Sequence, residues 1–151
     1  MKKLYTLGLL LIAGTIVVAQ SNKQVQWTFT AKKIADKVYE VHATATINDA
    51  YHLYAQAVGV EGPLPTTFTF TKNPLVAMDG KPKEVGKVVK KNEAVWGGVV
   101  NYYEKTVDFV QVVKLKSNIK TNLAGTVEFM VCNESLCLPP STVDFKVNVG
   151  G

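Results

Sequence analysis

Two cysteines are the residues of this chain that could carry redox chemistry, and the 151 residues contain no others. Cys132 and Cys137 lie close together, with four residues between them. A thiolate that attacks a partner's disulfide needs a second thiol nearby to release the product, and this pair meets that requirement. Two cysteines in an exported protein can also form an inert bridge. The spacing alone leaves both interpretations open.

The first residues of the chain have the pattern of a secretory signal peptide. Two lysines precede an apolar stretch over residues 4–18, and Ala19 supplies a small residue at its end. About fifteen apolar residues are fewer than the roughly 20 that a membrane-spanning helix needs. We therefore predict a signal peptide over residues 1–19, cleaved near Ala19, and one exported domain over residues 20–151. Stable membrane insertion after cleavage is not expected.

The basic residues do not favour nucleic acid as a partner. Every basic residue is a lysine, and the formal net charge falls from +5 to +3 when the two lysines of the signal peptide are removed. Arginine supplies the bidentate donors that recognise phosphates and base edges, and it is absent here. We expect a lysine-covered, solvated surface without nucleic-acid binding.

Other site chemistry has weaker support in the sequence. Cu(I) could be held by the two cysteines with Met130, because soft ligands suit it, but an ordinary core methionine explains Met130 equally well. Zinc would need three or four ligands. His42 is expected on the exposed, polar face of its strand. No Ser/His/Asp arrangement or Gly-rich phosphate loop supports a hydrolase or a kinase. We expect no bound metal or cofactor.

An alternation of apolar and polar residues dominates the chain and predicts seven to nine short β-strands. The clearest predicted strands cover residues 24–30, 38–47, 66–71, 106–116, 126–131 and 142–149. Turn residues fall between apolar runs, and they include residues 79–82 and 122–125. No helical pattern follows the signal peptide. The sequence therefore predicts an all-β fold, an immunoglobulin-like antiparallel β-sandwich.

The predicted strands place the two cysteines on either side of a short connection, residues 133–136. Opposed residues of a hairpin have Cβ atoms about 4.5 to 5.5 Å apart, close to the roughly 3.5 to 4.5 Å of a disulfide. Such a bond is easy to form. It closes a small loop, so the entropy that it removes from the unfolded chain stabilises the fold by only about 2 kcal/mol. The bond is therefore a weak choice as a stabiliser.

The segment from Cys132 to Pro140 resembles the active-site segment of the N-terminal periplasmic (alpha) domain of the thiol:disulfide interchange protein DsbD. In that family two closely spaced cysteines precede an apolar or aromatic residue and two prolines. Three further segments resemble the family in the same order, namely residues 49–54, 62–66 and 95–103. Together they span nearly the whole exported chain, which looks like a stand-alone relative of the domain.

The resemblance implies an immunoglobulin-like sandwich, in agreement with the strand pattern, and a periplasmic location. It also implies that Cys137 makes the mixed disulfide with a partner and that Cys132 resolves it. The implied partners are thioredoxin-like proteins or a membrane electron-transfer protein, and the implied activity is that of a protein-disulfide reductase component.

The chain also departs from the family. No multi-spanning membrane domain and no thioredoxin-like domain follow, so we expect the electron donor to be a separate protein. Val95 stands where the family has an aromatic cap over the disulfide, and Trp96 beside it could shield the bond instead. His52 and Tyr54, in the segment that resembles the family's aromatic strand, are expected near the cysteines, although an edge or packing role is the favoured interpretation of His52. The alternative function is a non-catalytic exported binding or accessory module with a structural disulfide.

Overall fold

The computed structural model describes the backbone of residues 18–151 and the side chains of residues 23–151. The predicted signal peptide therefore lies almost wholly outside the described residues and stays a prediction. Within the described part, no helix has the length and apolar character needed to cross a membrane.

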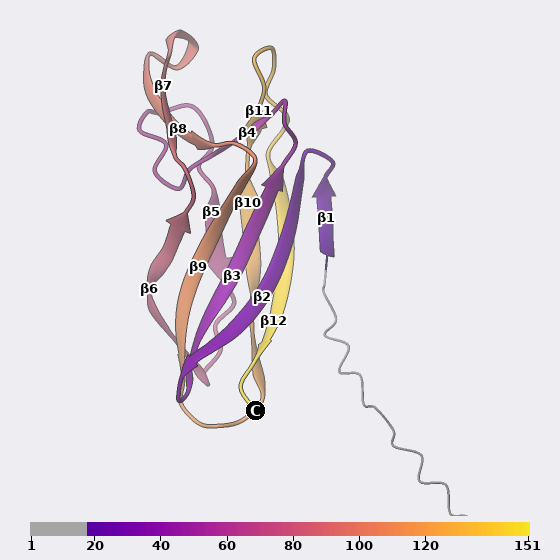
Figure 1. The fold of residues 1–151 in the computed structure, drawn as a ribbon, viewed down its shortest axis with the longest axis vertical. Coiled ribbons are helices and arrows are strands. Elements are labelled where there is room, and N and C mark those ends of the chain that lie inside the picture. Colours follow the sequence, from indigo (N-terminus) through magenta and orange to yellow (C-terminus); the bar gives the residue numbers. More distant parts are fainter. Residues whose placement is uncertain (1–17) are drawn as a thin grey trace, which may run out of the picture.

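Twelve strands in three antiparallel sheets make up the described chain (Figure 1). The five-stranded sheet has the order β1 (Val18–Asn22), β2 (Val25–Ala35), β3 (Val38–Ile47), β9 (Thr106–Leu115) and β6 (Val76–Val85). The three-stranded sheet consists of β12 (Ser141–Val149), β10 (Thr121–Phe129) and β5 (Thr67–Phe70). A smaller sheet consists of β11 (Val131–Cys132), β4 (His52–Tyr54), β8 (Gly98–Tyr103) and β7 (Val89–Glu93). One 3₁₀ turn, η1 (Ala94–Trp96), joins β7 to β8.

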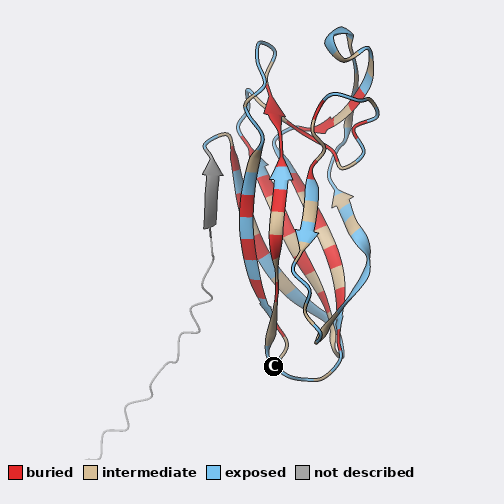
Figure 2. Ribbon diagram, turned by 180° about the vertical axis from the view of Figure 1, so that it is seen from behind, coloured by how far each residue is buried: buried red, intermediate tan, exposed pale blue. Residues whose placement is uncertain are grey.

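The core lies between the five-stranded and three-stranded sheets. Successive residues of β3, β9, β10 and β12 alternate between buried and more exposed, because side chains of a strand point to opposite faces (Figure 2). Trp27 is fully buried at the centre, with its ring 5.4 Å from that of Phe129 and 5.7 Å from that of Phe109. This aromatic packing holds the two layers together, and the smaller sheet extends from one end of them (Figure 1).

Several strand predictions are confirmed, and β3 has the predicted bounds. The predicted turn over residues 122–125 is wrong, because these residues lie inside β10. Gly125 has a packing reason to be glycine there: a Cβ at this position would overlap the carbonyl oxygen of Thr69 on the neighbouring strand β5. The glycine marks a close approach of two strands rather than a turn.

The predicted turn over residues 79–82 is also wrong, since it lies inside β6. The pairing of β6 with β9 shifts its register between Asp79 and Lys83, so the Asp-Gly sequence forms a bulge in the strand. Gln111 of β9 is buried beneath it and donates Nε2 hydrogen bonds of 3.3 Å to the carbonyls of Asp79 and Gly80. This amide satisfies backbone groups that the bulge takes out of the ladder.

His42 is not the solvent-exposed residue that the sequence predicts. Its side chain is 24% exposed, and Nδ1 lies 2.7 Å from Oδ2 of Asp108 on β9. Thr44 donates to the other oxygen of the same carboxylate at 3.1 Å. Asp108 therefore holds His42 against the outer face of the five-stranded sheet.

Candidate functional site

The two cysteines lie where the chain passes from the sandwich to the smaller sheet. Strand β10 ends at Phe129, and the chain then pairs with β4 instead, which places Cys132 opposite His52. It turns over residues 133–136 and returns, so that Cys137 forms an antiparallel bridge with Cys132. The predicted hairpin geometry is confirmed, with the two Cα atoms 4.0 Å apart and a disulfide between the side chains.

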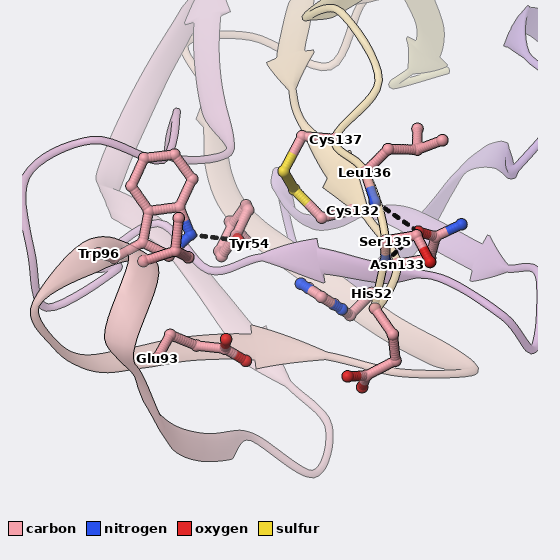
Figure 3. Close-up of a pocket in the computed structure, with 11 residues that line it drawn as sticks. His52, Tyr54, Glu93, Trp96, Cys132, Asn133, Ser135, Leu136 and Cys137 are labelled. Atoms are coloured by element: carbon pink, nitrogen blue, oxygen red, sulfur yellow. Dashed lines mark hydrogen bonds between the residues drawn. A yellow bond between two sulfur atoms is a disulfide. The ribbon is translucent and has the colours of Figure 1, made fainter.

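Asn133 fixes the turn between the cysteines. Its Oδ1 accepts hydrogen bonds of 2.8 Å from the backbone amides of Ser135 and Leu136, and its own amide donates to the Leu136 carbonyl at 2.9 Å (Figure 3). Asparagine favours such turns because its side chain can replace a backbone acceptor. Asn133 was not singled out from the sequence, although an asparagine directly after a strand is a turn signal.

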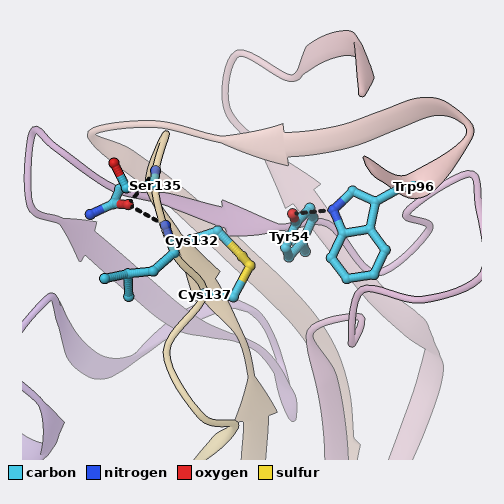
Figure 4. The surroundings of a disulfide bond; sticks show 7 residues. Tyr54, Trp96, Cys132, Ser135 and Cys137 are labelled. Carbon is cyan, nitrogen blue, oxygen red and sulfur yellow. Dashed lines mark hydrogen bonds between the residues drawn. A yellow bond between two sulfur atoms is a disulfide. The ribbon is translucent and has the colours of Figure 1, made fainter. Parts of the chain in front are cut away.

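The two sulfurs differ in their surroundings. Cys132 is only 2% exposed and packs in a second apolar cluster, whereas Cys137 is exposed (Figure 4). The other buried members of this cluster are Tyr54, Val58, Val100, Tyr102 and Met130. Met130 and Cys132 share this cluster while Val131 enters the main core, as the strand alternation predicts. An outside thiol therefore reaches the disulfide from the Cys137 side.

A cavity of about 410 Å³ opens beside the disulfide. It brings together all six residues predicted for the site: Cys132, Cys137, His52, Tyr54, Val95 and Trp96. Glu93 and residues 133–136 complete its lining, and they were not predicted from the sequence as part of the site. Residues 133–136 are the connection between the cysteines, whereas Glu93 comes from a hairpin that is distant in the sequence.

Val95 and Trp96 lie across the cavity from the cysteines. Val95 is 78% exposed. Trp96 donates from Nε1 to the Tyr54 hydroxyl at 3.2 Å, and Tyr54 lies between the indole and the disulfide (Figure 4). Trp96 thus stands opposite the sulfurs rather than over them.

Burial controls the protonation of the cavity's rings. The His52 ring lies against Tyr102, with 4.2 Å between centroids, and meets Tyr54 edge-on at 5.3 Å. Desolvation lowers the pKa of His52 below 6.5, although Glu93 and Glu104 act in the opposite direction. Burial also raises the pKa of Tyr54, against the effect of the Trp96 hydrogen bond. At neutral pH His52 is therefore a neutral imidazole and Tyr54 a neutral phenol.

Lys91 joins the two walls of the cavity. Its Nζ lies 3.1 Å from Glu93 on its own strand and 3.4 Å from Glu134 in the cysteine turn. The hydrogen bond with Glu93 and the charge of Glu134 raise the pKa of Lys91. Both walls are thus linked by one ammonium, and the two carboxylates at the cavity are paired with it.

Gly62 is expected to be essential for the position of Trp96. Its φ is +125°, and a Cβ there would overlap the indole ring. We expect Gly62→Ala to lower the free energy of unfolding by about 1 to 3 kcal/mol, as overpacking does, measured by urea denaturation. Gly80→Ala is the matched control, because Gly80 also has a positive φ but a Cβ added there would meet no atom within 4 Å. Equal losses of unfolding free energy in the two variants would contradict the close contact between Gly62 and Trp96.

Comparisons with known proteins identify the family and the fold of this chain. Residues 18–149 match the family model described as "Thiol:disulfide interchange protein DsbD, N-terminal". The fold is similar to that of the N-terminal periplasmic domain of ScsB from Proteus mirabilis, with a TM-score of 0.57 and 18% identity over 85% of this chain and 47% of that chain. It is also similar to the reduced DsbD N-terminal domain of Neisseria meningitidis, with a TM-score of 0.51 and 17% identity over 89% of this chain and 86% of that one.

These similarities confirm the predicted immunoglobulin-like β-sandwich. At such identities they show the fold alone. The chain spans about half the length of the ScsB chain that it matches. A search of curated proteins finds no match.

Proposed function

The chain belongs to the family of DsbD N-terminal domains, and from this membership we propose that it is a periplasmic thiol–disulfide interchange module. It passes electrons between protein partners through the Cys132–Cys137 couple. The observation that carries the proposal is the disulfide beside an open cavity, with one cysteine exposed and the other buried. A purely structural disulfide does not require one exposed and one buried cysteine.

The exposure of Cys137 supports the following order of events. When the module is reduced, a partner's thiolate attacks Sγ of Cys137, the Cys132–Cys137 bond breaks, and Cys132 leaves with the electron pair. When the module reduces a partner, the Cys137 thiolate attacks the partner's disulfide and forms a mixed disulfide. Cys132 then attacks Cys137, and the partner leaves as a thiolate. Both directions pass through Cys137, and the thiols themselves carry the two electrons without a cofactor.

The partners are thioredoxin-like proteins or a membrane electron-transfer protein, which supply or accept a dithiol. The periplasm suits the reaction, because disulfides form and persist there. Cleavage of the signal peptide near Ala19 would remove the pairs of Val18 and Ala19 with β2 and keep that of Asn22 with Val25.

Reduction by a thioredoxin-like protein tests the proposal. The oxidised mature protein is mixed with a reduced thioredoxin-like protein, and free thiols are labelled and counted by mass at successive times. We expect both cysteines to become labelled within minutes, with matching oxidation of the donor. A disulfide that stays closed while the donor remains reduced would favour the structural-bridge alternative.

A further inference from the structure

His52 faces the buried cysteine directly. In the pairing of β4 with β11, His52 and Cys132 are opposite each other, and both side chains line the cavity (Figure 3). Directly opposed residues of an antiparallel pair have Cβ atoms about 4.5 to 5.5 Å apart. His52 and Cys132 are thus neighbours by backbone register, independently of loop conformation.

The reaction creates a need for a base at this point. Cys132 attacks only as a thiolate, yet it is 2% exposed among apolar and aromatic side chains. Such surroundings favour the neutral thiol and raise the pKa of a cysteine. A group beside Cys132 that accepts its proton would offset this cost.

Among the residues that line the cavity, His52 is best suited to this task. Tyr54 is a neutral phenol at pH 7, because burial raises its pKa. Glu93 and Glu134 are both paired with Lys91. His52 has a lowered pKa, so its imidazole is neutral and free to accept a proton at pH 7.

We propose that His52 is the acid–base residue of the exchange, accepting the proton of Cys132 as this thiol resolves the mixed disulfide. The inference rests on the proposed function. In the step, the Cys132–Cys137 bond forms, the bond from Cys137 to the partner breaks, and the electron pair leaves with the partner's sulfur. The proton of Cys132 goes to the His52 imidazole, and it returns to Cys132 when the disulfide is next reduced.

Charged groups around His52 support the transfer. Glu93 of β7, Glu104 after β8 and Glu134 of the cysteine turn all favour the imidazolium, and Lys91 opposes it. The rings of Tyr54 and Tyr102 contact the imidazole from β4 and β8. The three carboxylates would stabilise the positive charge that His52 gains.

An assay that follows the two steps of the exchange separately distinguishes the role of His52 from the proposed function. Reduced protein mixed with dithiobis(nitrobenzoate) releases one coloured thiolate when Cys137 attacks and a second when Cys132 resolves. His52→Phe keeps an aromatic ring against Tyr102 but cannot take a proton. We expect it to slow the second release by roughly 10²-fold at pH 7, the lower end of what a positioned base contributes, and to leave the first unchanged.

The pH dependence of the second release provides a second test of the role of His52. In the unsubstituted protein the second release should slow at acidic pH, where His52 becomes protonated, with a midpoint below the 6.5 of an ordinary imidazole because burial lowers the pKa of His52, and it should level off above that midpoint. In His52→Phe it should keep rising toward the pKa of the thiol. His42→Gln is the matched control, because the chain has two histidines and His42 lies on the outer face of the five-stranded sheet. This control should leave both releases and their pH profiles unchanged.

His52→Gln repeats the test with a smaller side chain, and both variants are checked for folding by circular dichroism. An unchanged second release, or equal slowing of both releases, would overturn the role of His52. So would slowing in Glu93→Gln without slowing in His52→Phe, which would assign the proton to Glu93. Loss of the second release in the unsubstituted protein would instead contradict the proposed function.

Discussion

Replacing Cys137 with serine is expected to abolish exchange, whereas replacing Cys132 with serine is expected to leave a protein that accumulates a mixed disulfide with its partner. Cys137 is the exposed cysteine and Cys132 the buried one, so we expect a partner to reach the disulfide through Cys137. Without Cys132 the mixed disulfide has no intramolecular thiol to resolve it. The measurement is non-reducing electrophoresis and mass after each reduced variant is mixed with a thioredoxin-like protein that keeps one active-site cysteine, activated as a disulfide with nitrothiobenzoate.

Both variants are expected to remain folded. The bond closes a short loop and contributes about 2 kcal/mol in the entropic model, less than the total stability of an ordinary domain. Leu136→Ala is a suitable control, because it alters an exposed residue of the same turn and keeps both cysteines. An unfolded Cys137→Ser protein, or a mixed disulfide that forms equally through Cys132, would contradict the assignment.

Replacing Trp27 with alanine is expected to cause the largest loss of stability, about 3 to 5 kcal/mol. The ring is fully buried and packs against four phenylalanines, so its removal leaves a cavity between the two layers. Denaturation in urea, followed by circular dichroism, measures the change.

Trp27→Phe is the matched variant. Nε1 of Trp27 is buried without a hydrogen-bond partner among the described residues, which costs free energy in the folded state. Phenylalanine removes this donor and keeps most of the aromatic surface. We expect roughly half the loss of Trp27→Ala or less. Equal losses in both variants would contradict the packing role assigned to the ring.

The sandwich could be predicted from the sequence because its strands are long and alternate regularly. In β3, ten residues alternate without interruption, and the predicted bounds match. Two glycines inside strands were mistaken for turn residues. Gly125 lies inside a strand because β5 approaches it closely, and Gly80 forms part of a bulge held by Gln111. Both depend on a neighbouring strand that is distant in the sequence.

The candidate site was predicted in part. The cysteines and the segments around them were found because their types and order resemble a family, and all six residues line one cavity. The pairing of His52 with Cys132 could not be predicted, since β4 and β11 are three and two residues long and show no usable alternation. Glu93 was missed for the same reason, because its link to the cysteine turn through Lys91 and Glu134 joins two hairpins that are distant in the sequence.

The reduction potential of the Cys132–Cys137 couple tests the central claim most directly. The purified mature protein is equilibrated with glutathione or dithiothreitol buffers of known potential, and its free thiols are labelled and measured by mass. A working exchange module should titrate between about −270 and −120 mV, the range of known exchange proteins. A potential below about −300 mV would identify a structural bridge and contradict the proposed function.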